Sequence, residues 1–511
     1  MKNLILIGSV ACSATIGFTQ TDTYVLEQNN VSAILSNNGV FFNDATSNLP
    51  GYEVPTGSGN HLIYAMSFWF GGTDINGQVK LAAQTYTGES DFFPGALTND
   101  GPAIASIPPQ NAGIYPVLKS EIDYHIAHFN DVGYVVPASI ANWPAHGDYT
   151  LSIAYLLAPF EDVNGDGMYN PANGDYPKIK GDEAVYMILN DKADIHGSTG
   201  DPIGLEIHYL FYQFNTADYR NDVTFLNMRV INRGTQTLYN FHSGCFVDPA
   251  VGNGSDDYAG YSAVGNVMYA YNSDNNDADY GANPPALGIT LLSQQASGFN
   301  TFTVSGPTTL PTSSTHYLDN MQGMWSDGSH FTQGGNGYGG TVETNFLYSG
   351  NPNDGATWSE LSAGNIPGER SMLLSADHDV LKPFQQICFD YAIIYNKDGN
   401  NLQNVQNVID DALAINTWYA GEDFYCEYGT PLGLKRKVNE ISVYPNPSKD
   451  GFYVNLDGVY DLDIFTMEGR SVYRESKVSN QAFVDLDLET GVYLIIARQD
   501  DKTYQYKMLI E

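Results

Sequence analysis

Short apolar runs alternate with clusters of Gly, Asn, Asp and Ser along most of the chain. Runs of this length, bounded by turn-forming residues, are typical of strands in β-sandwiches and barrels. The pattern therefore predicts an all-β fold built mainly of antiparallel sandwich domains. The best strand candidates are residues 61–70, 79–86, 205–214, 223–231, 238–247 and 387–395.

One segment, residues 402–419, departs from this rhythm. Its apolar residues recur at helical spacing, and Gly421 stands just past the last of them, where helices commonly end. The sequence predicts one helix near the end of the body, with its apolar stripe packed on a sheet. That stripe consists of Leu402, Val405, Val408, Ile409, Ala412 and Leu413.

The last seventy or so residues have a different pattern. In the segment 452–457, apolar side chains alternate with polar ones, which is the period of a half-buried strand. Glu468-Gly469-Arg470 fits a hairpin turn, and two further strands are expected at 492–497 and 504–510. We therefore expect a small Ig-like β-sandwich from about Val438 to Glu511.

This segment contains short motifs in a fixed order at the chain end: Tyr444, Pro445, Asn446, Pro447, Gly469, Arg470, Gly491, Tyr493 and Lys507. On these residues it resembles a known family, the type A C-terminal sorting domain carried by cargo of the type IX secretion system in the Bacteroidota.

The resemblance implies partners and a location. The partners are the type IX secretion machinery and a sortase-like peptidase that removes the domain. The cargo is then secreted, or held at the outer-membrane surface by attachment to lipopolysaccharide. The basic run Lys435 to Lys437 marks the linker where the cut is expected.

The N-terminus carries a second export signal. Lys2 precedes an apolar stretch from Leu4 to Ala11, and small residues lead up to Gln20. This is the pattern of a cleavable signal peptide, and no later run is long and apolar enough for a transmembrane helix.

The chain length and these boundaries predict several regions. We expect a signal peptide (1–19), a β-rich region with a calcium-type loop (20–200), a sandwich that ends in the helix (201–425), a linker (426–437) and the sorting domain (438–511). Segments of the body also resemble a module of unassigned function in type IX cargo, notably 57–86, 142–148, 162–182 and 204–214.

The formal net charge is −36, and it is unevenly distributed. Residues 435–511 hold 10 of the 22 basic residues but only 13 of the 58 acidic ones, so the body carries most of the excess negative charge. Nucleic acid is a poor partner for such a surface, because its phosphates are neutralised by Lys and Arg. The simplest interpretation is a solvated surface; divalent cations are the alternative.

The most specific chemical motif is Asp162-Val163-Asn164-Gly165-Asp166-Gly167. Oxygen side chains at loop positions 1, 3 and 5 can reach one calcium ion, and glycine at position 6 allows the sharp turn. An EF-hand would have Glu at position 12, where this chain has Asn173, so a free-standing loop is the better interpretation. The predicted calcium ligands are Asp162, Asn164, Asp166, Met168 through its carbonyl, Asn170 and Asp175.

A second acidic group follows the 238–247 strand and permits three interpretations: a solvated loop, another calcium site, or a carboxylate pair for glycoside hydrolysis. It consists of Asp248, Asp256, Asp257, Asp274 and Asp277.

Other candidates favour structural roles. His146 lies two residues before Asp148, and a hydrogen bond between them would lock a loop; a zinc site is the alternative. Tyrosines between Tyr258 and Tyr280 could stack on sugars but more often pack within sheets. After Cys12 is removed with the signal peptide, the three remaining cysteines allow one disulfide.

Together these features predict a calcium-stabilised, surface-exposed or secreted β-sandwich protein with a non-catalytic binding, adhesion or structural role. Glycan or surface lipopolysaccharide are the expected ligands, and no catalytic residue is assigned. The alternative is a secreted polysaccharide hydrolase that uses carboxylates from the loops between Asp248 and Asp279.

Overall fold

The computed structural model describes residues 22–88, 90–99, 101, 111–422, 441–444, 448–449, 451–466, 470–484, 488–499 and 502–510. The predicted signal peptide, the linker with Lys435–Lys437, and Pro445, Asn446, Pro447 and Gly469 lie outside these residues. The chain divides into two compact units, Met1–Tyr428 and Gly429–Glu511, which are described separately.

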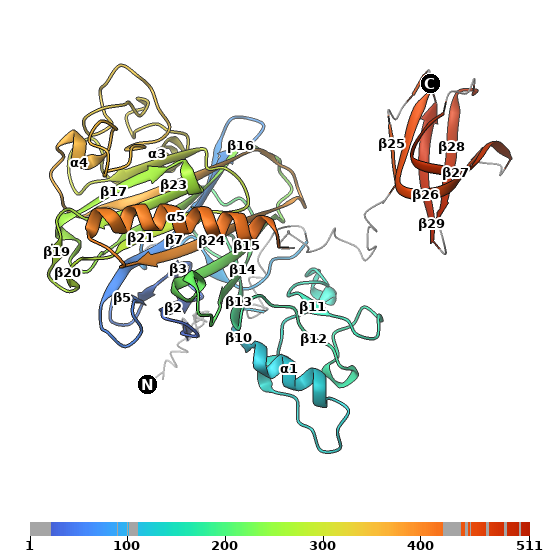
Figure 1. Cartoon of the computed structure of the whole chain (residues 1–511), viewed down its shortest axis with the longest axis horizontal. Helices are drawn as coiled ribbons and strands as arrows, with labels where there is room; N and C mark the ends of the chain where they lie inside the picture. Colours follow the sequence, from blue (N-terminus) through green and yellow to red (C-terminus); the bar gives the residue numbers. More distant parts are fainter. Residues whose placement is uncertain are drawn as a thin grey trace, which may run out of the picture. The chain divides into compact units, whose positions relative to one another are not determined.

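The first unit, called the body, is a sandwich of two nine-stranded sheets (Figure 1). The first sheet has the order β1 (Thr23–Leu26), β2 (Ser32–Ser36), β6 (Tyr52–Glu53), β7 (His61–Thr73), β16 (Leu238–Pro249), β23 (Ser371–Leu381) and β22 (Gly298–Phe302), with β3 (Val40–Phe41) and β8 (Val79–Ala83) also paired to β7.

The second sheet has the order β10 (Ile114–Leu118), β13 (Glu183–Asn190), β14 (Leu205–Gln213), β15 (Val223–Asn232), β24 (Gln386–Asn396), β21 (Ala286–Leu291), β18 (Val267–Asn272) and β17 (Asp257–Ser262), with β9 (Phe93–Pro94) paired to β13. All pairings are antiparallel.

The predicted division at residue 200 runs through this second sheet. β13 precedes residue 200 and β14 follows it, yet the two strands pair along their length, with Met187 opposite Tyr209. Residues on both sides of the division also contribute to the core between the sheets, for example Phe68 from β7 and Phe389 from β24. The body is therefore one compact unit.

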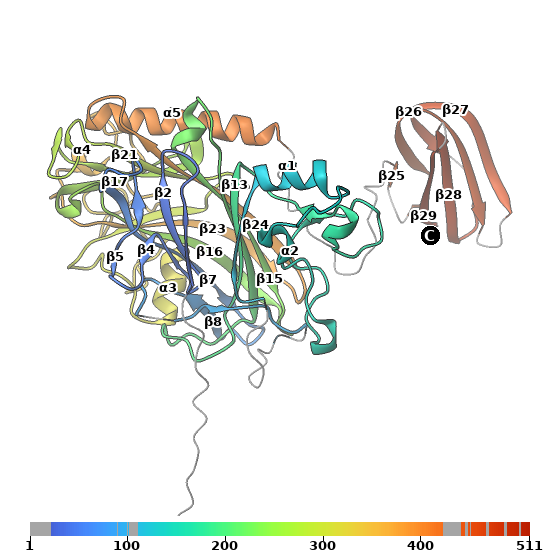
Figure 2. The ribbon, with the colours of Figure 1, turned by 90° about the horizontal axis from the view of Figure 1, so that it is seen from below.

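Helices cover the outer faces of both sheets (Figure 2). The predicted helix is confirmed as α5 (Asn401–Ala420), which packs on β18, β21 and β24. The side chain of Asn400 caps its N-terminus by accepting a hydrogen bond from the Gln403 backbone N–H. Leu413, assigned to the apolar stripe from the sequence, is instead half exposed.

Other helices were not predicted. α3 (Ser314–Met321) covers the first sheet, where Met321 and Leu318 pack with Trp69. The segment 119–182 covers part of the second sheet with α1 (Lys119–His128) and α2 (Ala138–Ala141). A further short helix is α4 (Glu360–Ala363), and three two-stranded ribbons complete the body: β4–β5 (Asn43–Asp44, Leu49–Pro50), β11–β12 (Phe160–Glu161, Tyr176–Pro177) and β19–β20 (Asn276–Asp277, Gly281–Ala282).

The second unit has its own strands and its own core, as the sequence predicts. Its sheet has the order β25 (Ile441–Tyr444), β26 (Phe452–Thr466), β28 (Gly491–Gln499) and β29 (Lys502–Ile510), with β27 (Ser471–Val484) paired to β26. Buried side chains such as Leu462, Ile464 and Ile495 form the core.

Candidate functional site

The predicted calcium loop lies between β11 and β12. The carboxylate of Asp162 accepts hydrogen bonds from the backbone N–H groups of Gly165, Asp166 and Gly167, at 2.7, 3.2 and 2.7 Å. Gly165 and Gly167 have φ angles of 74° and 78°, which glycine adopts without strain. The D-x-N-x-D-G sequence therefore folds the loop tightly around the first carboxylate.

The other predicted ligands have distinct environments. Asn164 and Asp166 are exposed and bonded to each other, with 2.9 Å from Asn164 Nδ2 to Asp166 Oδ2. Asn170 caps a short turn by accepting from the Ala172 N–H. Asp175 is fully buried, and its two oxygens accept from the N–H groups of Val163 and Asn170, at 2.9 and 2.8 Å. Asp175 thus joins the two limbs of the loop.

This donor set is compatible with calcium through side-chain and carbonyl oxygens. Among the described residues, no group of three His, Cys, Asp or Glu side chains is arranged to hold a metal ion. The calcium site, which would also use Asn164, Asn170 and the Met168 carbonyl, therefore stays a prediction.

His146 anchors this loop to the segment 144–158. Its Nδ1 lies 3.1 Å from the Tyr155 carbonyl, and its Nε2 accepts the Tyr169 N–H at 2.8 Å. The ring also stacks on Tyr155, with centroids 4.1 Å apart. The expected loop-locking role is present, but the partner is not Asp148, whose carboxylate caps Thr150.

The second acidic group does not form one cluster. Asp257 and Asp277 are buried and accept backbone N–H groups from the 250–256 loop, from Val251 and Asn253 respectively. The Asp256 carboxylate accepts from Asn272. These three side chains hold the loop, whereas Asp248 faces a different space. The tyrosines from Tyr258 to Tyr280 singled out from the sequence are buried rather than exposed.

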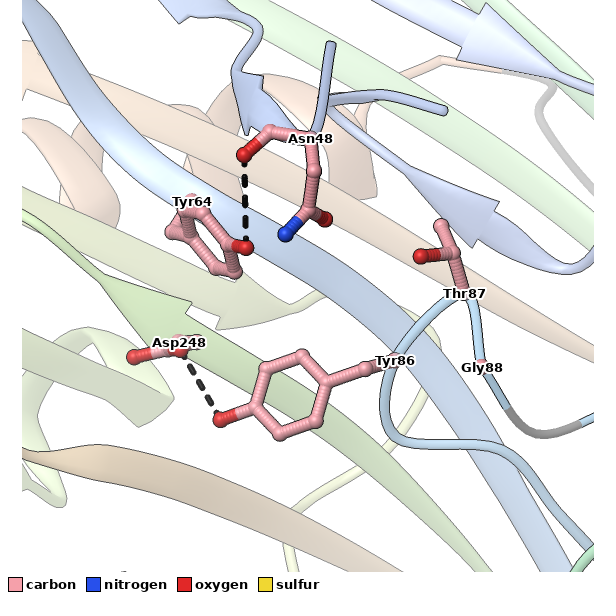
Figure 3. Close-up of a pocket in the computed structure, with 6 residues that line it drawn as sticks. All are labelled: Asn48, Tyr64, Tyr86, Thr87, Gly88 and Asp248. Atoms are coloured by element: carbon pink, nitrogen blue, oxygen red, sulfur yellow. Dashed lines mark hydrogen bonds between the residues drawn. The ribbon is translucent and has the colours of Figure 1, made fainter. Parts of the chain in front are cut away.

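Asp248 lines an open pocket of about 460 Å³ at one end of the first sheet (Figure 3). The lining comes from four parts of the chain: the β4–β5 turn, the strand β7, the segment after β8, and β16, which is distant from the others in the sequence. The lining residues are Asn48, Tyr64, Tyr86, Thr87, Gly88 and Asp248.

Two tyrosines shape this pocket. Tyr86 donates a hydrogen bond from its hydroxyl to Asp248 Oδ2 at 2.9 Å, and the Tyr64 hydroxyl donates to the Asn48 carbonyl at 3.4 Å. Their rings meet at a steep angle, with centroids 6.1 Å apart and 60° between planes. Tyr86 is held from behind by an edge-on contact with Phe246. The pocket therefore has aromatic walls fixed by packing and hydrogen bonds.

The pocket environment changes the protonation of Asp248. Burial raises its pKa to about 7, and the negative charge of Glu369 acts in the same direction, while the hydrogen bond from Tyr86 opposes both. Burial, with the Asp248 charge next, also raises the pKa of Tyr86. At mildly acidic pH the pocket thus holds a neutral carboxyl group that can both donate and accept hydrogen bonds.

A buried polar network lies on the outer face of the second sheet. His208 Nε2 lies 2.8 Å from Glu206 Oε1, and Arg233 pairs with the same carboxylate at 2.7 Å. Burial, with Arg229 next, lowers the pKa of His208 to about 3. The adjoining cavity, of about 10 Å³, holds no more than a water molecule, so this network stabilises the sheet and offers no ligand site.

The described sorting-motif residues occupy turns and strands of the second unit. Gly491 begins β28, Arg470 immediately precedes β27, and Lys507 lies in β29. Tyr493 is buried, and its hydroxyl donates to the Glu489 carbonyl at 2.8 Å. Tyr493 therefore has a structural role in the turn that precedes β28.

The cysteines have different states. Cys388 in β24 is disulfide-bonded, as the sequence allows, while Cys245 in β16 is free and buried. Cys426 lies outside the described residues.

The pocket residues Asn48, Tyr64 and Tyr86 were not identified from the sequence. They are far from Asp248 along the chain, and the pairing of β7 with β16 brings Tyr64 near Asp248. Tyr64 and Tyr86 lay inside predicted strands, and no local motif marks either residue.

Comparison with known proteins identifies the second unit. Residues 442–511 match the family described as the secretion system C-terminal sorting domain. The match confirms the resemblance to type IX cargo, the location outside the cell or at its surface, and an interaction with the secretion machinery. No helix in the described part of the chain is long and apolar enough to cross a membrane.

Among curated proteins, an ulvan lyase from Nonlabens ulvanivorans is 30% identical over 82 residues, which is 15% of this chain and 15% of the lyase. A solved polysaccharide lyase aligns over 66% of this chain and 37% of its own, with 9% identity and a TM-score of 0.19. The surface component PorZ of the Porphyromonas gingivalis type IX system aligns over 94% and 74%, with 9% identity and a TM-score of 0.14. Such low TM-scores support no argument about the body.

Proposed function

We propose that the body is a glycan-binding module that the sorting domain delivers to the cell surface or the medium. The observation that carries this proposal is the pocket of Tyr64, Tyr86 and Asp248, in which aromatic walls stand beside a half-buried carboxyl group. Sugars present both apolar C–H faces and hydroxyl groups. A site with aromatic rings and a few fixed polar groups complements both.

The remaining features support a binding role. The pocket is open and lies where turns emerge from a rigid sheet, a common place for recognition. In the proposal, the 162–175 loop binds calcium and stiffens the body, and the sortase-like peptidase removes the sorting domain after export. Attachment to surface lipopolysaccharide and an origin in the Bacteroidota belong to the same proposal.

The test is affinity electrophoresis of the purified chain through gels that contain soluble polysaccharides. The wild type should be retarded by at least one glycan. Tyr86→Ala should abolish the retardation, since it removes one wall and the partner of Asp248. Tyr149→Ala changes a tyrosine that is 72% exposed and outside the pocket, and it should behave as the wild type. Equal retardation of all three proteins would refute the proposed site.

A second candidate is a polysaccharide hydrolase. It is favoured by the raised pKa of Asp248, at about 7, which suits a general acid, and by the proximity of the Glu369 charge. In this version, Asp248→Asn would abolish the release of reducing ends while leaving retardation in the gel intact. If the wild type binds a glycan but releases no reducing ends, the hydrolase is excluded and the glycan-binding module remains.

A further inference from the structure

The described residues that line the pocket carry no positive charge. Among the described residues that line it, the ionisable groups are Tyr64, Tyr86 and Asp248, and no Lys, Arg or His is present. Tyr64 comes from β7, Tyr86 from the segment after β8, and Asp248 from β16. The groups that act on Asp248 are Tyr86 and, just before β23, the carboxylate of Glu369. Every charge that this set can acquire is negative.

Such a wall disfavours an acidic sugar. A uronate or sulfate group entering the pocket would lose water without gaining a cationic partner among the described lining residues. The nearby charge of Glu369 and, above about pH 7, that of Asp248 would repel it. Sites that bind carboxylate or sulfate usually contain Arg or Lys, whose guanidinium or ammonium groups match the anion. The net charge of −36 adds long-range repulsion.

The same wall suits a neutral sugar. Tyr86 already donates to Asp248, which orients the carboxyl group, and the Asn48 amide and Thr87 hydroxyl also border the space (Figure 3). Below about pH 7 these groups supply both donors and acceptors to hydroxyls without placing a charge in the pocket.

Building on the proposed function, we infer that this pocket selects an uncharged, hydroxyl-rich sugar unit and rejects units that bear uronate or sulfate. Protonation of Asp248 adds a donor and removes a buried charge, so binding is tightest at mildly acidic pH and weakens as pH rises past about 7.

The experiment is calorimetric titration of the full chain with two sets of oligosaccharides. The neutral set contains β-1,3-glucan, galactan and mannan fragments; the acidic set contains oligogalacturonate and chondroitin sulfate fragments. We expect a neutral fragment to bind at least tenfold more tightly than any acidic fragment at pH 6. Its affinity should fall severalfold by pH 8 in the wild type and stay level in Asp248→Asn, which is neutral throughout.

Blocking variants separate the outcomes. Tyr86→Ala removes a wall, and Thr87→Trp fills the pocket without removing a wall; each is checked by its thermal melt. Tighter binding of an acidic fragment that both variants abolish would overturn the inference and leave the proposed function standing. Binding of neither set, or binding that neither folded variant weakens, would overturn the proposed function and the inference with it.

Discussion

The raised pKa of the Asp248 carboxyl group results from the residues that pack around it. Its carboxyl group is held by the Tyr86 hydroxyl and lies near Glu369, with no cation among the pocket-lining residues that the structure describes. Nothing in the local sequence distinguishes Asp248 from the many other acidic residues of this chain. Its role depends on the pairing of β16 with β7, which is a property of the whole sheet.

A stability measurement tests the protonation of Asp248. The folded chain keeps this proton up to about pH 7, whereas the unfolded chain releases it near the ordinary value of 3.8. The unfolded state therefore binds fewer protons in this window, and the free energy of unfolding falls as pH rises through it. The free energy of unfolding of Asp248→Asn does not fall in this way, because the amide side chain does not titrate.

In urea unfolding, the free energy of unfolding of Asp248→Asn should rise relative to that of the wild type between pH 4 and pH 8. The gain should be at most about 4 kcal/mol, because one pKa unit corresponds to about 1.4 kcal/mol. A difference between variant and wild type that stays constant over this range would mean that Asp248 titrates normally.

His146 provides a second test at the scale of the residue. His146→Leu removes the acceptor of the Tyr169 N–H and the donor to the Tyr155 carbonyl. We expect a loss of about 1–3 kcal/mol in the free energy of unfolding, because a half-buried N–H is left without its partner. The control is His128→Ala, which removes an exposed pair with Asp131 and a ring contact with the exposed Tyr124, and should cost less than about 0.5 kcal/mol. Equal effects would contradict the anchoring role.

At the scale of elements, the sequence predicted long, strongly patterned segments best. Strands near 61–70, 205–214, 223–231, 238–247 and 387–395 and the helix near 402–419 all appear within a few residues of their expected ends. Local period and turn residues determine such elements directly.

The sequence pattern was less informative elsewhere. α1 has no strong apolar stripe, since only Ile122 and His125 are buried, so nothing in its pattern marked a helix. The pocket depends on the register between β7 and β16, so the sequence pattern did not indicate it either. The 162–175 loop lies between these cases, because its turn follows from the motif while the buried clamp by Asp175 does not.

The contact between α5 and its sheet depends on one glycine. A Cβ atom added to Gly288 of β21 would lie 2.2 Å from Val408 Cγ1 of α5. Gly288→Ala should therefore force the helix away from the sheet and destabilise the body by about 1–3 kcal/mol.

Gly421→Ala is the matched control at the end of the same helix. There the nearest atom, the Trp418 carbonyl oxygen, lies 3.4 Å away, and φ is −90°. Thermal unfolding should show a clear decrease for Gly288→Ala and almost none for Gly421→Ala. Two similar shifts would show that α5 is not packed as described.

Calcium belongs to the element scale too, because its predicted ligands lie in one loop. If the ion holds this loop, chelation with EDTA should lower the melting temperature of the full chain by several degrees, and added calcium should restore it. Asp162→Asn should reduce the response to the chelator. No shift on chelation would contradict the calcium prediction and leave the sugar pocket unaffected.

At the scale of the whole molecule, the two units have separate roles. The second unit matches a sorting domain and accounts for export, while most of the negative charge and the open pocket belong to the body. The export signal was visible in the sequence because its motifs are local and ordered. The binding site was not, since it is assembled from residues 48 to 248.

The central claim is that the body binds a glycan through the pocket of Tyr64, Tyr86 and Asp248. Its most direct test is a calorimetric titration of the wild type and of Tyr86→Ala with a neutral oligosaccharide that retards the wild type in the gel. We predict one site per chain in the wild type, with at least a tenfold loss of affinity in the folded variant. Unchanged affinity in Tyr86→Ala would contradict the claim.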